Sequence, residues 1–201
     1  MKILIVPSIR EIYKNQLEYC VDLKLIDMLK KLFRDTKIEI YNNKLDDYYD
    51  LILLSGGNDV LLRKRKDKIR FKINNLIFNF ALKKKIKIIG ICYGAQYLAK
   101  KYRFKIKKIN NHVGSHNVYF NIKDRKFTKV VNSFHNCAIE LSQKQNIDVF
   151  GIADDNTIEA FHIKKNKILG IMWHPERYKK IKKFDLSLIK SFYTNNSVNV
   201  S

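Results

Sequence analysis

The stretch KKKIKIIGICYGAQYLAKKY, residues 83–102, joins a strand pattern directly to a helix pattern. Its first part alternates and then becomes wholly apolar, which predicts a buried strand over residues 86–91. Its second part places apolar side chains at helical spacing, namely Ala95, Leu98, Ala99 and Tyr102. Cys92 therefore lies where a buried strand turns sharply into a helix, between two glycines.

The turn from Gly90 to Gly94 suits a nucleophilic thiol. Glycines two positions before and after Cys92 let the strand and the helix approach each other. A helix N-terminus favours thiolate over thiol, and the backbone N–H of Tyr93, the first helical residue, would face a developing oxyanion. The alternative is a buried structural cysteine that packs as a small hydrophobe.

Short apolar runs alternate with amphipathic stretches along the first half of the chain, which predicts an α/β fold with a mainly parallel central sheet flanked by helices. The expected strands are 2–8, 37–42, 50–57 and 86–91. The expected helices are 12–33, 67–83 and the one that follows Cys92. The face of the first helix would comprise Leu17, Val21, Leu25, Met28, Leu29 and Leu32, with Cys20 also on its inner side.

The second half is rich in β-forming residues and predicts additional antiparallel strands. These are expected near 117–122, 128–134, 147–153, 157–163 and 167–173, with a final helix near 184–193. No linker or repeat divides the chain, so one domain is expected over 1–193, followed by a polar, disordered tail over 194–201.

The composition restricts the partners and the compartment. The chain has 201 residues, and 40 Lys and Arg against 19 Asp and Glu give it a net charge of +21. The lysines occur along the whole length without a nucleic-acid motif, so no nucleic-acid partner is expected. Three cysteines form no disulfide framework, and no segment resembles a signal peptide or a membrane span. These features predict a cytoplasmic protein with reduced thiols and no membrane partner.

A thiolate nucleophile needs a histidine that exchanges protons with it. Of the five histidines, His174 ends an apolar run, and Pro175 fixes the backbone so that Glu176 stays near the imidazole. The alternative for His174 is a surface histidine in a turn. His162 lies within a β pattern and is expected to be a strand residue.

The remaining chemistry-bearing residues give weaker patterns. His112 and His116 are four residues apart, but the stretch HVGSH contains Gly114 and shows no carboxylate nearby in the sequence. Cys137 has no evident chemical partner. No metal site and no cofactor are therefore expected.

With G-x-C-x-G-x-Q at 90–96, H-P-E at 174–176 and a Gly-Gly turn at 56–57, the chain resembles the class I glutamine amidotransferases over about residues 1–193. Within that superfamily it is most similar to the γ-glutamyl hydrolases, the C26-type cysteine peptidases. The resemblance implies hydrolysis of a γ-glutamyl amide through a thioester on a Cys-His-Glu triad.

The resemblance also implies a role for each matching residue. Cys92 would be the nucleophile, His174 the general base and acid, and Glu176 the group that orients His174. The backbone N–H groups of Gly57 and Tyr93 would form the oxyanion hole. The glutamyl group would contact Gln96, Ser133, Phe134 and His135.

Ser55 stands where many amidotransferases have proline before the paired glycines, and 201 residues leave no room for a synthetase domain beside the expected one. One alternative is therefore a glutaminase subunit that supplies ammonia to a separate synthetase. A second alternative is a non-catalytic module that binds nucleic acid through its basic surface.

The leaving group is not fixed by the triad. The resemblance to the hydrolase branch implies a small-molecule substrate, with a nucleotide-linked amine used in capsular polysaccharide modification as the narrower expectation. Arg63 and Arg65, in a basic run after the Gly-Gly turn, and Arg177 after H-P-E are candidate contacts for its diphosphate. The alternative for the basic run is a solvated helix start.

Overall fold

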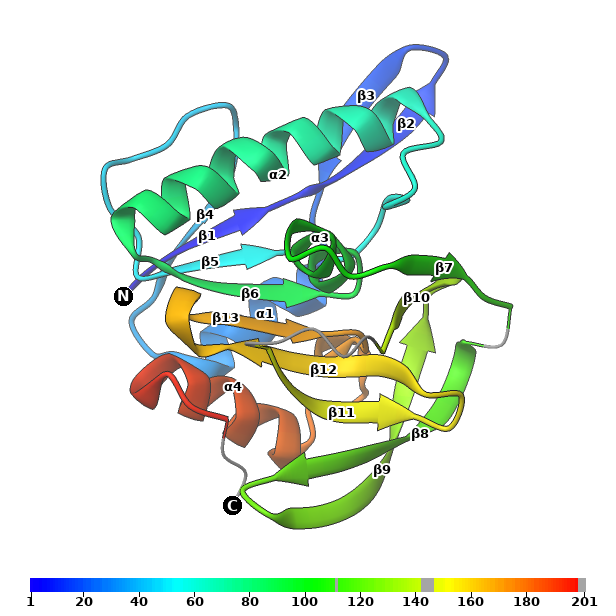
Figure 1. Cartoon of the computed structure of the whole chain (residues 1–201). Coiled ribbons are helices and arrows are strands. Elements are labelled where there is room, and N and C mark those ends of the chain that lie inside the picture. Colours follow the sequence, from blue (N-terminus) through cyan, green and yellow to red (C-terminus); the bar gives the residue numbers. More distant parts are fainter. Residues whose placement is uncertain (111, 142–146, 199–201) are drawn as a thin grey trace.

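The computed structural model describes residues 1–110, 112–141 and 147–198 (Figure 1). Its strands are β1 (Lys2–Val6), β2 (Ser8–Tyr13), β3 (Gln16–Cys20), β4 (Lys37–Ile40), β5 (Leu51–Leu54), β6 (Lys87–Ile91), β7 (Ile106–Lys108), β8 (Val113–Ile122), β9 (Arg125–Phe134), β10 (Cys137–Glu140), β11 (Asp148–Ala153), β12 (Thr157–Ile163) and β13 (Ile168–Ile171). Its α-helices are α1 (Leu23–Leu32), α2 (Arg65–Lys84), α3 (Tyr93–Lys101) and α4 (Lys183–Asn195). Short 3-10 turns cover Lys164–Asn166 and Pro175–Arg177.

One large sheet runs through the molecule in the order β4-β1-β5-β6-β13-β12-β11-β8-β9. The pairs from β4 to β13 are parallel, and those from β13 to β9 are antiparallel. β10 branches from β12 and also pairs with β7, while β2 and β3 form a separate hairpin. The predicted α/β class, with a mainly parallel core and added antiparallel strands, is confirmed.

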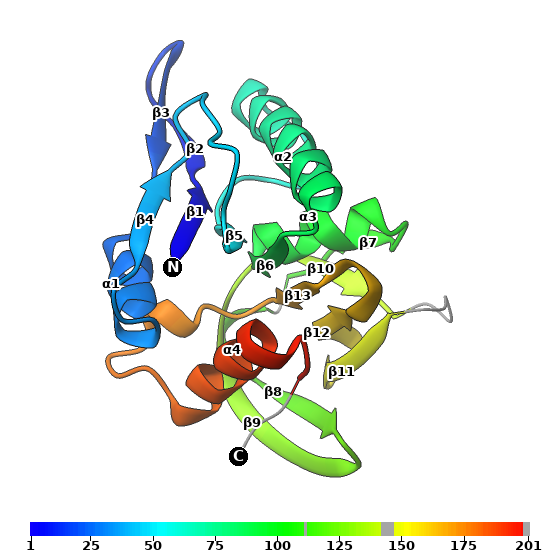
Figure 2. The same cartoon turned by 90° about the vertical axis from the view of Figure 1, so that its left-hand side faces the viewer.

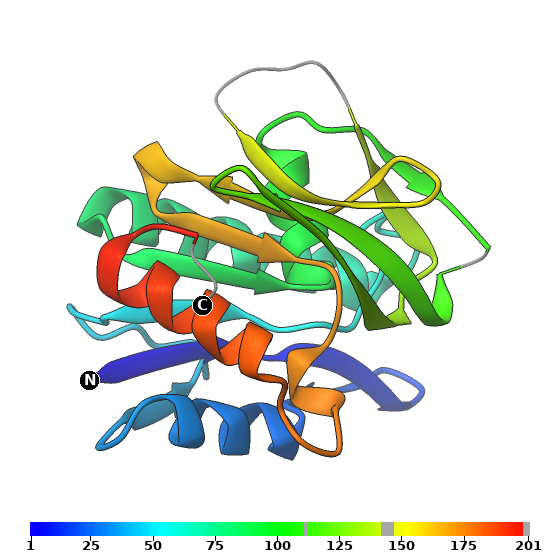
Figure 3. The same cartoon turned by 90° about the horizontal axis from the view of Figure 1, so that it is seen from below.

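Helices cover both faces of the parallel strands (Figures 1 and 2). Because successive side chains of a strand point to opposite faces, Ile3 and Ile5 of β1 pack with α1 and α4, whereas Leu4 and Val6 pack with α2 and α3. The view from below shows α1 and α4 together on the near face (Figure 3). The wholly apolar strand runs in the sequence follow from burial on both faces.

The expected helix over residues 12–33 is wrong in its first half. Residues 8–20 form the β2–β3 hairpin, and Asn15 takes a positive φ of 69° at its turn. The helix begins only after Asp22, whose side chain accepts a hydrogen bond from the backbone N–H of Lys24. Cys20 is consequently a half-buried strand residue and not a core residue of a helix.

The expected tail is partly ordered. The final helix, expected over 184–193, extends to Asn195, and Val198 is buried in the core with α4. Residues 199–201 lie outside the described residues. None of the helices that the structure describes is long and apolar enough to cross a membrane.

Candidate active site

Cys92 occupies the turn between β6 and α3, as the sequence predicts. Its φ of 50° and ψ of −104° are strained for a residue with a side chain, and its backbone N–H donates to the carbonyl oxygen of Ile171 in β13. Cys92 is therefore the residue at which α3 begins, next to the end of β13.

Two glycines permit this arrangement by close approach. A Cβ on Gly94 would collide with the carbonyl oxygen of Leu54, so α3 can meet the end of β5 only with glycine there. A Cβ on Gly56 would lie 2.6 Å from Cε1 of His174 and 3.6 Å from Cβ of Cys92. The first glycine serves the packing of the fold, and the second leaves room for the imidazole beside the thiol.

His174 and Glu176 form a buried pair. Nδ1 of His174 lies 2.6 Å from Oε1 of Glu176, which leaves Nε2 for the thiol. Burial alone would lower the pKa of His174, but contacts with Cys92 and Glu176 raise it to about 9. The contacts with Cys92 and Glu176 thus favour the protonated form of the imidazole.

Asn132 in β9 holds the backbone of His174 and was missed by the sequence analysis. Its side-chain Nδ2 donates to the carbonyl oxygen of His174, and its Oδ1 accepts from the N–H of His174, both at 2.8 Å. Its own backbone N–H donates to the hydroxyl of Tyr178. The sequence VNSFHN at residues 131–136 contained this signal, since Asn132 directly precedes Ser133, Phe134 and His135, the three residues that the resemblance singled out.

Two cavities meet at His174. The smaller, of about 120 Å³, is lined by Gly57, Asn58, Asp59, Val60, Cys92, Gln96, Phe134, His135, Asn136, Cys137, His174 and Arg177. The larger, of about 490 Å³, extends past Gly56 and Glu176 to the β2–β3 hairpin and contains Ser8, Arg10, Asp22 and Lys66. His174, Gly57 and Arg177 line both cavities, and Cys92 lines the smaller one, so one molecule could occupy them together.

Three of the four residues expected to hold the glutamyl group line the smaller cavity. The Nε2 of Gln96 donates to the carbonyl oxygen of Cys137 at 2.9 Å, and the ring of Phe134 packs edge-on against His174. Ser133 is fully buried and donates to the carbonyl oxygen of His112 instead of lining either cavity.

The candidate leaving-group residues separate into two groups. Arg177 lines both cavities, and its guanidinium stacks over the ring of Phe134 at 4.7 Å. Arg63 pairs with Asp59 at 3.4 Å, and the exposed Arg65 begins α2; neither lines either of these cavities. The larger cavity instead receives Arg10 and Lys66, which sequence reasoning did not single out.

The expected oxyanion donors flank the thiol. Tyr93 is the first residue of α3, so its N–H has no acceptor within the helix. Gly57 lines the smaller cavity with Cys92 and has a positive φ of 87°. A buried arginine, Arg70, lies beneath this turn and donates to the carbonyl oxygen of Ser55 at 3.3 Å.

Glu159 of β12 is fully buried among three histidines, which corrects the expectation that His112 and His116 lack a carboxylate. The third histidine is His135, and Asp155 approaches His112 from the outside. Burial alone would raise the pKa of Glu159, but the facing imidazoles, when protonated, hold it well below its ordinary value. His162, on the same strand, is buried elsewhere against Phe192, as a strand residue should be.

The family model described as glutamine amidotransferase class-I matches residues 14–195. The chain is 40% identical over 132 residues to a gamma-glutamyl-CDP-amidate hydrolase of Campylobacter jejuni, covering 63% of this chain and 62% of that protein. It is 28% identical over 130 residues to a glutamine-hydrolyzing GMP synthase subunit of Methanococcus vannielii, covering 62% of this chain and 63% of that protein. The match thus spans a little under two thirds of the length of these relatives.

A crystal structure of a glutamine amidotransferase from Thermotoga maritima is similar in fold. Its TM-score is 0.65 at 16% identity, with 87% of this chain and 76% of that chain covered. Since the family model matches nearly the whole chain, this protein belongs to the class I glutamine amidotransferase family.

Proposed function

We propose that this chain is a cysteine hydrolase that cleaves a γ-glutamyl amide and releases glutamate and an amine. The observation that carries the proposal is the placement of Cys92 beside the buried pair of His174 and Glu176, where two cavities meet. The smaller cavity suits a glutamyl group, and the larger one suits the leaving group.

The first half of the reaction forms a thioester. The Cys92 thiolate attacks the γ-carbonyl carbon, and the N–H groups of Gly57 and Tyr93 stabilise the oxyanion. Nε2 of the His174 imidazolium then donates its proton to the leaving nitrogen as the C–N bond breaks. Glu176 keeps the imidazole oriented throughout through Nδ1.

The second half consumes one water molecule. Neutral His174 takes a proton from water as the water attacks the thioester carbonyl. The C–S bond breaks, glutamate leaves, and the thiolate–imidazolium pair forms again. No cofactor is required for these steps.

The larger cavity supports an anionic leaving group. Three cationic side chains line it, those of Arg10, Lys66 and Arg177. Two carboxylates, those of Asp22 and Glu176, also line it. Guanidinium and ammonium groups bind phosphate oxygens well. Together with the relative in Campylobacter jejuni, this favours γ-glutamyl-CDP-amidate as the substrate, with glutamate and cytidine diphosphoramidate as products, in capsular polysaccharide modification.

The experiment is a comparison of γ-glutamyl amides, with glutamine and nucleoside-diphosphate-linked amides included, by the rate of glutamate release. The highest kcat/KM is expected for a nucleotide-linked amide, and none of the amides should be cleaved by the Cys92→Ala variant. Equal turnover by that variant, or no glutamate release from any amide, would contradict the proposal.

A second candidate is a glutaminase subunit that passes ammonia to a separate synthetase. It is favoured by the relatives that are GMP synthase subunits and by apolar residues exposed beside the β2–β3 hairpin, including Tyr13 at 71% and Leu23 at 75% exposure. This candidate predicts glutamine hydrolysis that a co-purifying protein stimulates. Absence of glutaminase activity with and without such a partner would exclude it.

A further inference from the structure

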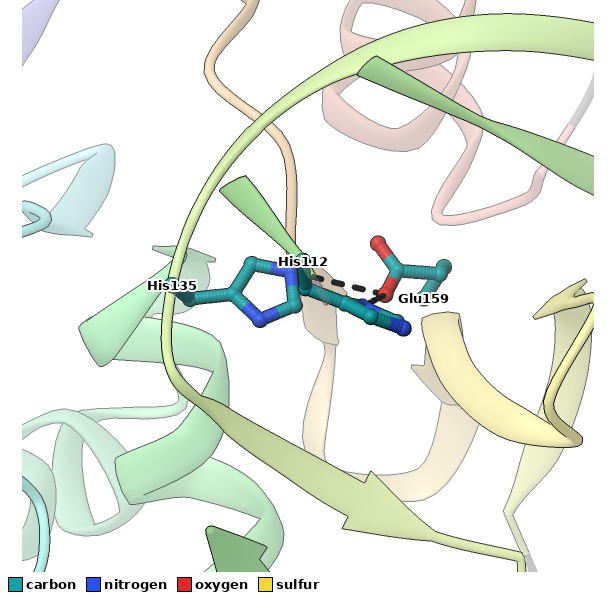
Figure 4. A group of neighbouring side chains, drawn as sticks. All are labelled: His112, His135 and Glu159. Atoms are coloured by element: carbon teal, nitrogen blue, oxygen red, sulfur yellow. Dashed lines mark ion pairs between the residues drawn. The ribbon is translucent and has the colours of Figure 1, made fainter. Parts of the chain in front are cut away.

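Three histidines from separate parts of the chain surround one carboxylate. His112 directly precedes β8, His116 lies in β8, and His135 lies between β9 and β10, while Glu159 lies in β12. Their ring nitrogens lie 3.3, 3.4 and 3.5 Å from the carboxylate oxygens, for Nδ1 of His112, Nε2 of His116 and Nε2 of His135, respectively. In Figure 4 the two dashed lines drawn, from His112 and His135, meet at one oxygen of Glu159.

These facing atoms have no hydrogen-bond partners among the described residues. The unpartnered buried atoms are Nδ1 of His112, both nitrogens of His116, Nε2 of His135 and both oxygens of Glu159. Burying such a group without a partner is unfavourable, because its hydrogen bonds to water are lost and not replaced. Except for Nδ1 of His116, these unpartnered atoms face one another across Glu159, which indicates that a further group belongs among them.

The outer nitrogens of two of the rings already have acceptors. Nδ1 of His135 lies 3.0 Å from the carbonyl oxygen of Cys137, and a carbonyl can only accept, so Nδ1 carries the proton. Nε2 of His112 lies 3.2 Å from Oδ2 of Asp155. In each neutral ring the nitrogen facing Glu159 is then a lone pair. Histidines that ligate metals show this pattern, with the second nitrogen donating to a carboxylate or a carbonyl.

We propose that His112, His116, His135 and Glu159 bind a divalent transition-metal ion of the Zn²⁺ class. Imidazole nitrogens with one carboxylate are ligands that zinc and its neighbours prefer. Donors about 2.0–2.2 Å from a tetrahedral ion lie roughly 3.3–3.5 Å apart, as the nitrogen–oxygen separations do here. The donor atoms of His112, His135 and Glu159 all lie within 4.8 Å of one another. Nε2 of His116 faces the other oxygen of Glu159, so the ring of His116 must turn inward to complete the site.

Protonation of all three rings is a poorer solution than a metal ion. The ring of His112 lies 4.4 Å from that of His116 and 5.0 Å from that of His135, centre to centre. Three imidazolium ions at these distances would repel one another around a single carboxylate. One divalent ion satisfies all four groups and leaves a net charge of +1 with Glu159.

The ion would tie the antiparallel strands to the smaller cavity. His135 lines that cavity together with Cys92, while Glu159 belongs to β12, whose partner β13 leads to His174. The ion therefore has a positioning role and does not contact the reacting atoms. Ion binding itself does not depend on the proposed function.

The test measures zinc bound to the untagged full chain, in the Cys92→Ala background so that the active-site thiol contributes no ligand. After chelation and dialysis, titration with ZnCl₂ should give one tight site per chain by calorimetry and by elemental analysis. Co²⁺ in place of zinc should produce the strong visible bands of tetrahedral coordination. A hundredfold excess over Kd should raise the Tm by roughly 5–10 °C.

Glu159→Gln keeps the side-chain size but removes the charge, and it should abolish the site, while His162→Gln on the same strand should leave it intact. If Glu159→Gln does not fold, Asp155→Asn, at the exposed edge, should weaken zinc binding about 10- to 100-fold. Zinc binding that survives both Glu159→Gln and Asp155→Asn, or that disappears equally in His162→Gln, overturns the proposal. So does the absence of any site in the folded Cys92→Ala chain.

Discussion

The side chain of Asn132 clamps the backbone of His174 from both sides, giving one hydrogen bond to its carbonyl and taking one from its N–H. The clamp links β9, at the antiparallel end of the sheet, to the turn that carries the imidazole. Positioning of His174 therefore depends on the antiparallel strands as well as on the Pro175 turn.

Replacement of Asn132 by alanine should lower kcat about 10-fold and leave KM nearly unchanged, because the imidazole loses its alignment and not its contact with substrate. Steady-state kinetics of glutamate release check this. Asn117→Ala, an exposed asparagine on the neighbouring strand β8, is the control and should have no effect. A raised KM with unchanged kcat would show that Asn132 acts on binding instead.

Cys92→Ala should reduce glutamate release to background while the unfolding transition stays close to that of the parent. A glutamine-mimicking electrophile should label Cys92 and be found there by peptide mass spectrometry. Cys137 lines the same cavity, but burial raises the pKa of its thiol, so it should react slowly; Cys20→Ala is the matched control. Predominant labelling of Cys20 or Cys137 would contradict the assignment of Cys92 as the nucleophile.

Glu176→Gln should reduce kcat between roughly 10²- and 10⁴-fold and change the pH profile. In the parent, Cys92 and Glu176 offset the effect of burial and raise the pKa of His174 to about 9. Activity that needs the imidazolium is thus retained up to about pH 9 and lost above it. Without the carboxylate the pKa of His174 falls, so the alkaline limb of kcat/KM should move to lower pH. If the alkaline limb of kcat/KM stays at the same pH in Glu176→Gln, Glu176 does not control the pKa of His174.

Two glycine-to-alanine changes should affect different properties, activity in one case and stability in the other. Gly56→Ala brings a methyl group against the end of the His174 side chain, which can rotate away, so activity should be lost with little change in stability. Gly94→Ala brings a methyl group against the backbone of Leu54 and should cost about 3 kcal/mol of unfolding free energy. Urea denaturation beside activity assays distinguishes them, and an inactive but equally stable Gly94→Ala variant would contradict the packing argument.

Arg177→Ala should raise KM for a nucleotide-linked amide about 10-fold, the loss of one charge-assisted contact, and should leave glutamine hydrolysis unchanged. The matched control is Arg65→Ala, an exposed arginine that lines neither of the two cavities. An equal loss for both substrates would place Arg177 at the glutamyl end instead of the leaving-group end.

The structure around Cys92 and His174 could be predicted from the sequence because residues close together in the chain determine it. The strand, turn and helix around Cys92 follow from periodicity and glycine spacing, and the neighbours of His174 in the chain include Glu176 itself. Residues 12–20 of the β2–β3 hairpin were predicted as helix because Leu17 and Val21 happen to fit a helical repeat. The pairing of β2 with β3 makes this segment a hairpin, and the N-cap at Asp22 sets where the helix begins.

The cluster around Glu159 could not be predicted from spacing. His112 and Glu159 are far apart in the chain, and they meet because β11 pairs with both β8 and β12. Strand order in an antiparallel extension depends on long-range contacts that no local pattern records. The carboxylate near the HVGSH stretch was therefore invisible until the sheet order was known.

Cys92 and His174 follow the carboxyl ends of two neighbouring parallel strands. These ends lie side by side because Ile91 of β6 is in register with Ile171 of β13. Cys92 follows the first of these by one residue, and His174 follows the second by three. A single-residue insertion or deletion in β6 or β13 would change this register and move the thiol away from the imidazole. We therefore expect selection against insertions and deletions in these two strands during divergence.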